Sequence, residues 1–398
     1  MKKTNLLIAI TSLVLISITL TACGGANAQV PQATLIAESA QKTLTALKTL
    51  TPFGPSTNTP APTATITPTP APAEYGPSGF PSNVDPLTGL VVSDPTILDR
   101  RPVMIKVSNW PRIGRPHYGL SYADLVFEYY IGGGMNRFVG LFYGQNAEKV
   151  GPIRSGRYVD AQLVPMYQGI LGFESAYLPI YQKIVGTLGN RAIVGGPENC
   201  PAICDDGRGT VISVFSDTAA LSKLATERGV SNSRQNLDGM RFDTDVPQNG
   251  KAAQNVLVQF NIQDRGEWRY DAASGKYLRW IEDDNNELIP LTDALTDKQL
   301  SFSNVVVIYA NYIEYAASMH DITLADNTQG AKAYLFRDGQ AYEGIWKSAG
   351  ADKPMQFFNA DGSLMALKPG NSWIAILGSS TTLTQPETDR WNFQFNLP

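Results

Sequence analysis

Hydrophobic and polar residues alternate clearly along Leu125–Ile131, where every second side chain belongs to one apolar face. This period of two is typical of a β-strand, and Glu128 stands in the middle of the other face. A second apolar run, Phe138–Tyr143, follows after Gly132–Gly134. Because glycine reaches left-handed backbone angles without steric cost, the triple glycine favours a tight turn, and we expect a β-hairpin here.

Segments with strand and helix periods alternate around this hairpin. The pattern predicts strands at Pro102–Ser108, Ile170–Phe173 and Thr210–Phe215, and helices at Gly156–Met166, at Tyr177–Val185 and from Ala219 to Gly229. Ser216 and Asp217 supply side chains that can cap the last of these helices. Such alternation predicts a layered α/β domain over residues 83–230.

The pattern changes near Asn255, after which the sequence predicts strands without helices. They are expected at Asn255–Phe260, Glu267–Tyr270, Lys276–Glu282, Asn304–Ala310, Ala331–Phe336, Ala341–Lys347, Met355–Phe358 and Ser372–Leu377. Asp-Gly steps at Asp338 and Asp361 fit hairpin turns. We predict a mostly antiparallel β domain over residues 255–398, a connector at 231–254, and an α+β or α/β fold class for the chain.

The first residues have the pattern of a lipoprotein signal peptide. Lys2 and Lys3 precede the apolar run Leu6–Leu20, which at about 15 residues is short for a membrane span. The following Leu20-Thr21-Ala22-Cys23 resembles a bacterial lipobox, in which the cysteine is acylated, for example with palmitate. We expect removal of residues 1–22 and attachment to a lipid bilayer through Cys23, because two acyl chains suffice for stable anchorage. The alternative is an ordinary secretory signal with a chance cysteine.

A polar segment rich in threonine and proline separates this leader from the folded part. Within residues 23–82, the stretch Thr51–Pro77 carries a proline at almost every second or third position, which favours extended polyproline II over helix or sheet. At roughly 3.1 Å per residue, about 25 such residues span up to about 80 Å. We therefore expect a disordered stalk on the outer face of the bacterial cytoplasmic membrane. Glycosylation of its threonines stays open, because composition alone does not establish it.

Composition and cysteine spacing narrow the function classes. The chain of 398 residues has a formal charge of −4 and no basic blocks, which argues against nucleic-acid binding. In an extracytoplasmic, oxidising compartment, Cys200 and Cys204 are expected to form a disulfide. His117 and His320 are the only histidines, too few for a typical zinc site, so we expect no metal and no cofactor.

The candidate chemistry lies near the hairpin. Glu128 within a buried-looking strand needs a charged or polar partner, and Arg137 and Arg154 are the nearest candidates. One hypothesis is a structural ion pair; the other is a ligand pocket formed by Glu128, Arg137, Arg154, Arg157 and Asp160. Arginine suits such a pocket because its planar fork binds carboxylates, phosphates and sugar hydroxyls, and a helix starting near Gly156 would add free N–H groups.

Catalysis is the competing hypothesis. Asp124, Glu128, Asp160 and Glu174 include enough acids for a glycosidase pair, but their spacing gives no geometry. Ser155 lacks a nucleophile-elbow pattern, and the chain has no phosphate-binding loop or dinucleotide fingerprint. The tryptophans of the predicted second domain are interpreted as core, with sugar stacking as the alternative: Trp268, Trp280, Trp346 and Trp373. We expect a binding protein rather than an enzyme.

Short segments spread over about residues 83–377 resemble the YerB-like lipoproteins, a bacterial family known as a domain of unknown function. In the first half they are Leu87-Thr88-Gly89-Leu90, Arg101-Pro102-Val103, Gly119-Leu120-Ser121, Val126-Phe127-Glu128, Arg137-Phe138 and Gly151-Pro152-Ile153-Arg154-Ser155. In the second half they include Ser274-Gly275-Lys276-Tyr277, Asn304-Val305-Val306-Val307, Gly344-Ile345-Trp346-Lys347 and Ser372-Trp373-Ile374. The chain departs from the family at Gly172–Ala176 and Gly209–Ser213, where histidine-containing segments would be expected.

The resemblance implies an extracytoplasmic lipoprotein and no settled biochemical activity. Together with the residues, it predicts a membrane-anchored binding or scaffolding protein of the cell envelope. Its partner is expected to be a cell-wall polymer, anionic or saccharide, or another envelope protein. The alternative is a wall-polymer hydrolase or transferase that uses carboxylates of the first domain.

Overall fold

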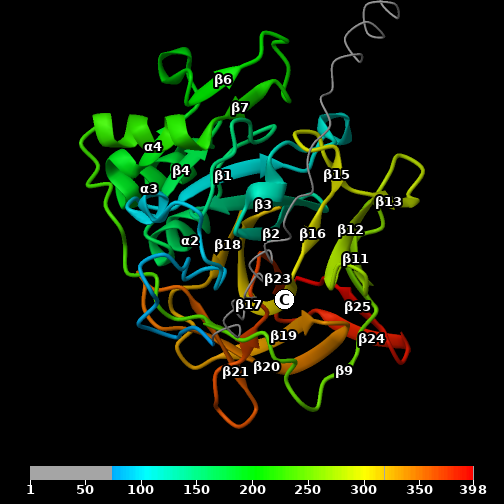
Figure 1. Cartoon of the computed structure of the whole chain (residues 1–398). Helices are drawn as coiled ribbons and strands as arrows, with labels where there is room; N and C mark the ends of the chain where they lie inside the picture. The colour runs from blue at the N-terminus through cyan, green and yellow to red at the C-terminus, as the bar shows by residue number, and fades with distance from the viewer. Residues whose placement is uncertain (1–73, 318, 398) are drawn as a thin grey trace, which may run out of the picture. The chain divides into compact units, whose positions relative to one another are not determined.

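The computed structural model describes residues 74–317 and 319–397, which consist mostly of strands with few helices (Figure 1). The predicted signal peptide, Cys23 and the stalk as far as residue 73 lie outside the described residues. Tyr75 already forms an antiparallel bridge with Phe242, and Pro77 accepts a hydrogen bond from the Gly239 amide at 2.7 Å. Ordered contacts therefore begin before Asn83, where the sequence predicted the first domain to start.

The largest sheet has twelve strands. In spatial order, ten of them are β21 (Met355–Asn359), β20 (Gln340–Ser348), β19 (Ala331–Arg337), β17 (Asn304–Ala316), β23 (Ser372–Gly378), β2 (Leu125–Gly132), β3 (Met135–Phe142), β1 (Val103–Ser108), β4 (Ile170–Phe173) and β5 (Ala192–Val194). The other two are β18 (Met319–Thr323), which pairs with β17, and β9 (Lys251–Ala252), which pairs with β20.

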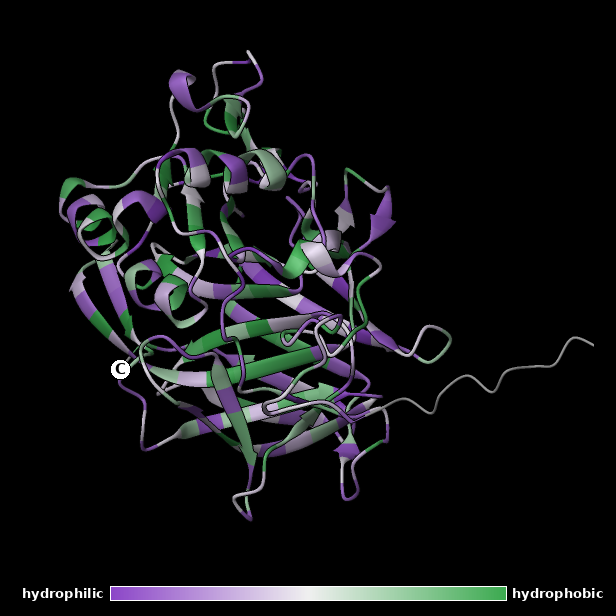
Figure 2. Cartoon of the chain, turned by 60° about the vertical axis from the view of Figure 1, so that its left-hand side comes forward, coloured by the Kyte–Doolittle hydropathy of each residue, from purple (hydrophilic) through white to green (hydrophobic). Residues whose placement is uncertain are grey.

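Parallel pairing of β2 with β23 joins the two halves of the chain in this sheet, with Val126 opposite Trp373. Every residue of β23 is buried, as expected of a strand covered on both faces. The main strands of residues 83–230, β1 to β5, consequently belong to a sheet that they share with strands of the C-terminal half. Figure 2 shows hydrophobic residues concentrated along the central strands and hydrophilic residues at many loops and hairpin ends.

A second sheet has seven strands. In order they are β13 (Leu288–Pro290), β12 (Lys276–Glu282), β11 (Asp264–Asp271), β10 (Asn255–Asn261), β25 (Arg390–Gln394) and β24 (Thr382–Glu387), with β16 (Ser301–Phe302) beside β12. The two sheets pack through aromatic rings: Trp373 lies 5.8 Å from Trp268 and 5.1 Å from Phe302, measured between ring centroids. Trp268, Trp346 and Trp373 are fully buried, so they belong to the core.

Three two-stranded sheets complete the strands of the described residues. They pair β14 (Thr292–Asp293) with β15 (Lys298–Gln299), β22 (Ala366–Leu367) with β8 (Arg241–Phe242), and β6 (Ile203–Asp205) with β7 (Val214–Ser216). Most strand pairs after Asn255 are antiparallel, but β10–β25 and β17–β23 are parallel. Cys200 and Cys204 form a disulfide at the entry to β6, with their Cα atoms 4.9 Å apart.

The described α-helices are α2 (Asp160–Met166), α3 (Leu178–Leu188) and α4 (Thr218–Glu227). Short 3-10 helices lie at Pro95–Leu98, Arg112–Gly114, Leu120–Tyr122, Gly189–Arg191 and Pro197–Asn199. The prediction for α4 is confirmed: the Asp217 carboxylate accepts a hydrogen bond from the Ala220 amide at 2.9 Å, and Leu221 and Ala225 form its buried face. Gly229 follows it with a positive φ of 81°, which glycine adopts at little cost.

The hairpin predicted at the triple glycine is also confirmed. Strands β2 and β3 pair in antiparallel register, and Gly132, Gly133 and Gly134 all have positive φ angles. The helix predicted from Gly156 instead begins at Asp160. Residues 156–159 remain outside it because the Asp160 carboxylate accepts the Arg157 amide at 2.7 Å and closes a turn before the helix.

Candidate functional site

The alternation of side chains along β2 divides the five predicted site residues between the two faces of the sheet. Glu128 and Tyr129 are neighbours in a strand, so their side chains point to opposite faces. In the β2–β3 register, Tyr129 lies opposite Arg137, whereas Glu128 lies opposite Phe138. Arg137 is therefore not the partner of Glu128. The structure separates Glu128 from the other four residues.

Glu128 forms a buried ion pair with Arg279 of the second sheet, with Arg279 Nη2 3.2 Å from Glu128 Oε1. Trp373 Nε1 donates to the other carboxylate oxygen at 2.7 Å, and the Asn136 amide donates to Oε1. The guanidinium also stacks over the Trp268 ring, 4.0 Å from its centroid. Burial raises the pKa of Glu128, and the Arg279 charge opposes that rise. Because neither side chain of the ion pair is exposed, this is a structural contact between the two sheets.

The opposite face of β2 carries a second buried cluster. Lys106 Nζ from β1 lies 3.1 Å from Asp160 Oδ1 at the start of α2, and the Tyr129 hydroxyl contacts both groups. All three side chains are fully buried. Burial lowers the pKa of Lys106 to about 7, although Asp160 favours its charged form, and Arg137 and Arg157 lower it further.

Three arginines surround this buried group. Arg137 Nη1 donates to the Ser155 carbonyl at 2.7 Å, and Arg157 Nη1 donates to the Gly156 carbonyl at 2.8 Å. Burial, together with the neighbouring Arg157 and Arg154 charges, lowers the pKa of Arg137 well below its usual value. The Nε atoms of Arg154 and Arg157 are buried and have no hydrogen-bond partner among the described residues. The guanidinium groups therefore retain unused donors.

We call the set Lys106, Arg137, Arg154, Arg157, Asp160 and Glu174 the arginine cluster. Glu174 belongs to it because its carboxylate is among the charges that act on Arg137, and its amide donates to the Arg154 carbonyl at 3.1 Å. Four basic groups thus face two acidic groups. Arg154, Arg157 and Glu174 are only partly buried, so the cluster extends from the buried Lys106 toward solvent. An excess of positive charge with unused donors is suited to an anionic ligand.

The sequence alone did not identify Lys106 of the arginine cluster, nor Tyr129, whose hydroxyl contacts Lys106 and Asp160. Lys106 was assigned only to a strand, and Tyr129 only to an apolar face. The available signal was a lysine in Val103–Ser108, a strand whose every residue is buried. Such a position forces a lysine to find a carboxylate or hydroxyl partner.

The two histidines, which are the residues to consider for a metal site, contact other residues of the fold. The His117 ring forms a hydrogen bond between Nε2 and the Ser108 carbonyl at 2.9 Å, inside the core. The His320 ring lies 3.8 Å from the Glu314 carboxylate, measured from Nε2. Within the described ranges, no group of three or more His, Cys, Asp or Glu side chains is placed to hold a metal ion.

Two family models cover most of the folded part. The model described as "Protein of unknown function (DUF3048) N-terminal domain" matches residues 87–231, and its C-terminal counterpart matches residues 248–374. The chain belongs to the DUF3048 family. This family assignment confirms the resemblance drawn from the short sequence segments.

One relative is similar to this protein over most of the chain. The chain is 28% identical over 304 residues to "Putative lipoprotein YerB" of Bacillus subtilis (strain 168), covering 73% of this chain and 85% of the relative. It also matches the crystal structure of the B. subtilis YerB protein with a TM-score of 0.62 and 25% identity, covering 74% of this chain and 96% of that chain. None of the helices between residues 74 and 397 that the structure describes is long and apolar enough to cross a membrane.

Proposed function

We propose that this DUF3048 protein is a lipid-anchored binding protein of the cell envelope, which holds an anionic envelope component at the arginine cluster. The lipobox-like segment ending in Cys23 supports the anchor, as does the description of its YerB relative as a lipoprotein. An anchor of this kind would display the folded part on the outer face of the membrane, at the end of the threonine- and proline-rich stalk.

The observation that carries the proposal is the unbalanced charge of the arginine cluster. An ordinary structural ion pair would match each guanidinium with a carboxylate. Here Asp160 Oδ1 is taken by Lys106 and Oδ2 by the Arg157 amide, so its carboxylate has little capacity for further donors. Arg154 and Arg157 are only partly buried, and their buried Nε atoms have no hydrogen-bond partner among the described residues. Bidentate binding of a phosphate or carboxylate would satisfy these donors.

The acids suggested for a hydrolase or transferase are arranged differently. Asp124 is buried and accepts the Tyr143 and Gly144 amides at 2.5 and 3.0 Å. Glu128 is bonded to Arg279, and Asp160 to Lys106. Of the four acids proposed for catalysis, Glu174 alone is partly exposed in this structure. A glycosidase needs two carboxyl groups facing one bond, so these contacts favour binding as the function.

Sedimentation with isolated bacterial cell wall tests the proposal on the full chain in detergent. We expect the protein to co-sediment without releasing soluble wall fragments, and binding to weaken as salt is raised. Arg154→Gln should reduce the affinity by about tenfold or more, because a charge-assisted hydrogen bond is lost. Arg208→Gln is the matched control, since Arg208 is half exposed and pairs locally with Asp206 at 2.7 Å.

Equal sedimentation of the Arg154 variant and the wild type would refute the arginine cluster as the binding site. Release of soluble wall fragments by the wild type would instead support the hydrolase alternative. A protein that binds no wall material, yet co-purifies with another envelope protein, would replace the polymer with a protein partner.

A further inference from the structure

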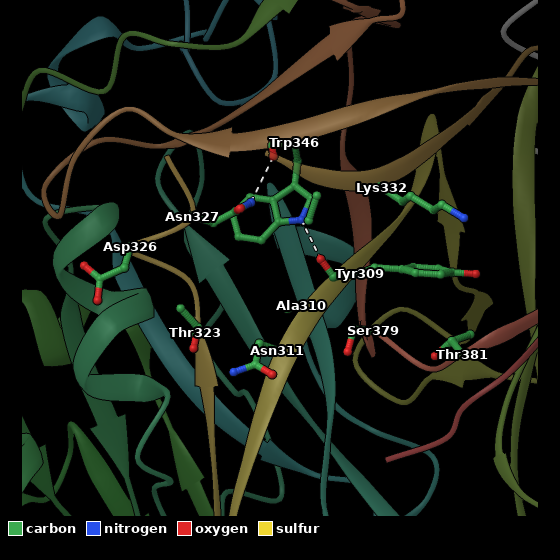
Figure 3. A pocket seen from close by; sticks show the side chains of 11 residues that line it. Tyr309, Ala310, Asn311, Thr323, Asp326, Asn327, Lys332, Trp346, Ser379 and Thr381 are labelled. Atoms are coloured by element: carbon green, nitrogen blue, oxygen red, sulfur yellow. Dashed lines mark hydrogen bonds between the residues drawn. The ribbon is translucent and has the colours of Figure 1, made fainter. Parts of the chain in front are cut away.

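A second candidate site lies in the C-terminal half of the chain, among strands that do not contribute to the arginine cluster. It is an open cavity of about 430 Å³ lined by β17, β18, β19, β20 and the loops after β18 and β23 (Figure 3). This volume falls within the range of roughly 300–1,000 Å³ that is typical of small-molecule sites.

The apolar floor of the cavity is held in place by hydrogen bonds. Trp346 is fully buried, and its Nε1 donates to the Tyr309 carbonyl at 2.8 Å. Asn327 Nδ2 donates to the backbone carbonyl of Trp346 at 3.0 Å, so the indole and the backbone of this residue are each held by a hydrogen bond (Figure 3). A preformed floor of this kind lowers the ordering cost of binding a ligand.

The walls carry polar side chains that do not bond to one another. Figure 3 draws hydrogen bonds among the lining residues only at Trp346, and none between the side chains of Asn311, Thr323, Ser379 and Thr381. Thr381 is only 8% exposed, and its hydroxyl has no hydrogen-bond partner within the described part of the chain. A buried hydroxyl without a partner is unfavourable, and a ligand hydroxyl or amide would supply the missing hydrogen bond.

The charge of the lining indicates the chemical class of the ligand. Asp326 and Lys332 contribute one charge of each sign, and the other polar groups are neutral amides and hydroxyls. Figure 3 shows the Lys332 ammonium and the Tyr309 hydroxyl pointing in the same direction, on the side away from Asp326. Amides and hydroxyls both donate and accept hydrogen bonds, as sugar hydroxyls do.

We propose that this cavity binds a neutral saccharide unit. The ligand class differs from the anion assigned to the arginine cluster, so this inference does not depend on that site. Trp346 is the buried floor of the cavity, which is compatible with its interpretation as a core residue. Sugar specificity would come instead from Asn311, Thr323 and Thr381.

Calorimetric titration of the full chain with cellotetraose, maltotetraose and tetraacetyl-chitotetraose tests the inference. We expect at least one of these probes to bind at millimolar concentration or below. Thr381→Val removes the hydroxyl with little change of shape and should weaken that binding by about five- to tenfold, whereas Thr381→Ser should retain it. Asn311→Ala, at an exposed position of β17, provides a second variant whose folding is not at risk.

Failure of all three probes to bind would overturn the inference. It would also be overturned if the folded Thr381→Val and Asn311→Ala variants both bound the saccharide as the wild type does. Arg154→Gln should leave saccharide binding unchanged, and a loss there would assign the saccharide to the arginine cluster. A negative saccharide titration would therefore leave the wall-binding proposal intact, and a negative wall sedimentation would leave the saccharide proposal intact.

Discussion

The buried pair of Glu128 and Arg279 gives the sharpest prediction about stability. Glu128→Gln keeps an acceptor for Trp373 Nε1 but removes the carboxylate paired with Arg279, whose cation then has only the more remote acids Glu282 and Asp264 nearby. The Nε and Nη1 atoms of Arg279 already have no hydrogen-bond partner among the described residues. Removing one member of a buried ion pair typically costs about 3–5 kcal/mol of unfolding free energy, and we expect Glu128→Gln to fall near the lower end.

A double variant tests whether this loss of unfolding free energy arises from the interaction between Glu128 and Arg279. Arg279→Met alone leaves the Glu128 carboxylate buried without its paired cation. The loss of unfolding free energy in this variant should become smaller as pH falls, because the raised pKa of Glu128 permits protonation. Glu128→Gln combined with Arg279→Met removes both charges and should cost less than either single change. Urea unfolding followed by tryptophan fluorescence measures all four proteins. The exposed pair Lys251–Glu343 is the control, where little coupling is expected.

Additivity of the two single changes, within about 0.5 kcal/mol, would refute the reasoning. Glu128 and Arg279 would then contribute to stability through their separate hydrogen bonds and ring contacts. A strongly stabilised double variant would not refute it, because well-packed apolar groups can replace a buried ion pair without loss.

Three further predictions concern pH. In the fold, Lys106 is largely neutral above its pKa of about 7, whereas in the unfolded chain it stays protonated up to about pH 10. The free energy of unfolding should therefore rise between pH 7 and 10, by at most about 1.4 kcal/mol per pH unit. Lys106→Met should abolish that rise. Burial raises the pKa of Asp124 to about 6 and that of neighbouring Asp85 well above its usual value. The contribution of these two carboxyl groups to stability should therefore fall as pH rises through 4–6, and Asp85→Asn should reduce that contribution. Burial lowers the pKa of His117 to about 3, so His117→Asn should reduce the stability lost between pH 6.5 and 3. Urea unfolding across pH measures each, and unchanged slopes would contradict them.

Local features of the fold were predictable because their determinants lie within a few residues. The triple glycine places the β2–β3 turn, and Asp217 with Gly229 bounds α4. The joining of the two halves was not predictable in this way. Val126 pairs with Trp373, and Glu128 reaches Arg279 from a position 151 residues away in the chain. Apolar strands such as β2 and β23 carry no local signal for which partner they choose.

The candidate site was predictable in part for the same reason. Arg154, Arg157 and Asp160 lie close in sequence, and Arg137 reaches them because the strand register places it on the Tyr129 face. Glu128 was grouped with them because it is near in sequence, but the period of a strand sends it to the opposite face. The saccharide cavity had no sequence signal, since its polar walls come from separate strands and two loops.

The two faces of β2 should therefore separate stability from binding. Glu128 lies between the sheets with no exposed surface, so a ligand cannot reach it without opening the core. Arg154 is partly exposed, and its side-chain Nε bonds to no described residue, so its loss should change the fold little. Glu128→Gln should consequently lower the unfolding free energy without changing the wall affinity of the folded protein, and Arg154→Gln should do the reverse. If the Arg154 variant lost both unfolding free energy and wall affinity, the arginine cluster would instead be a structural part of the fold.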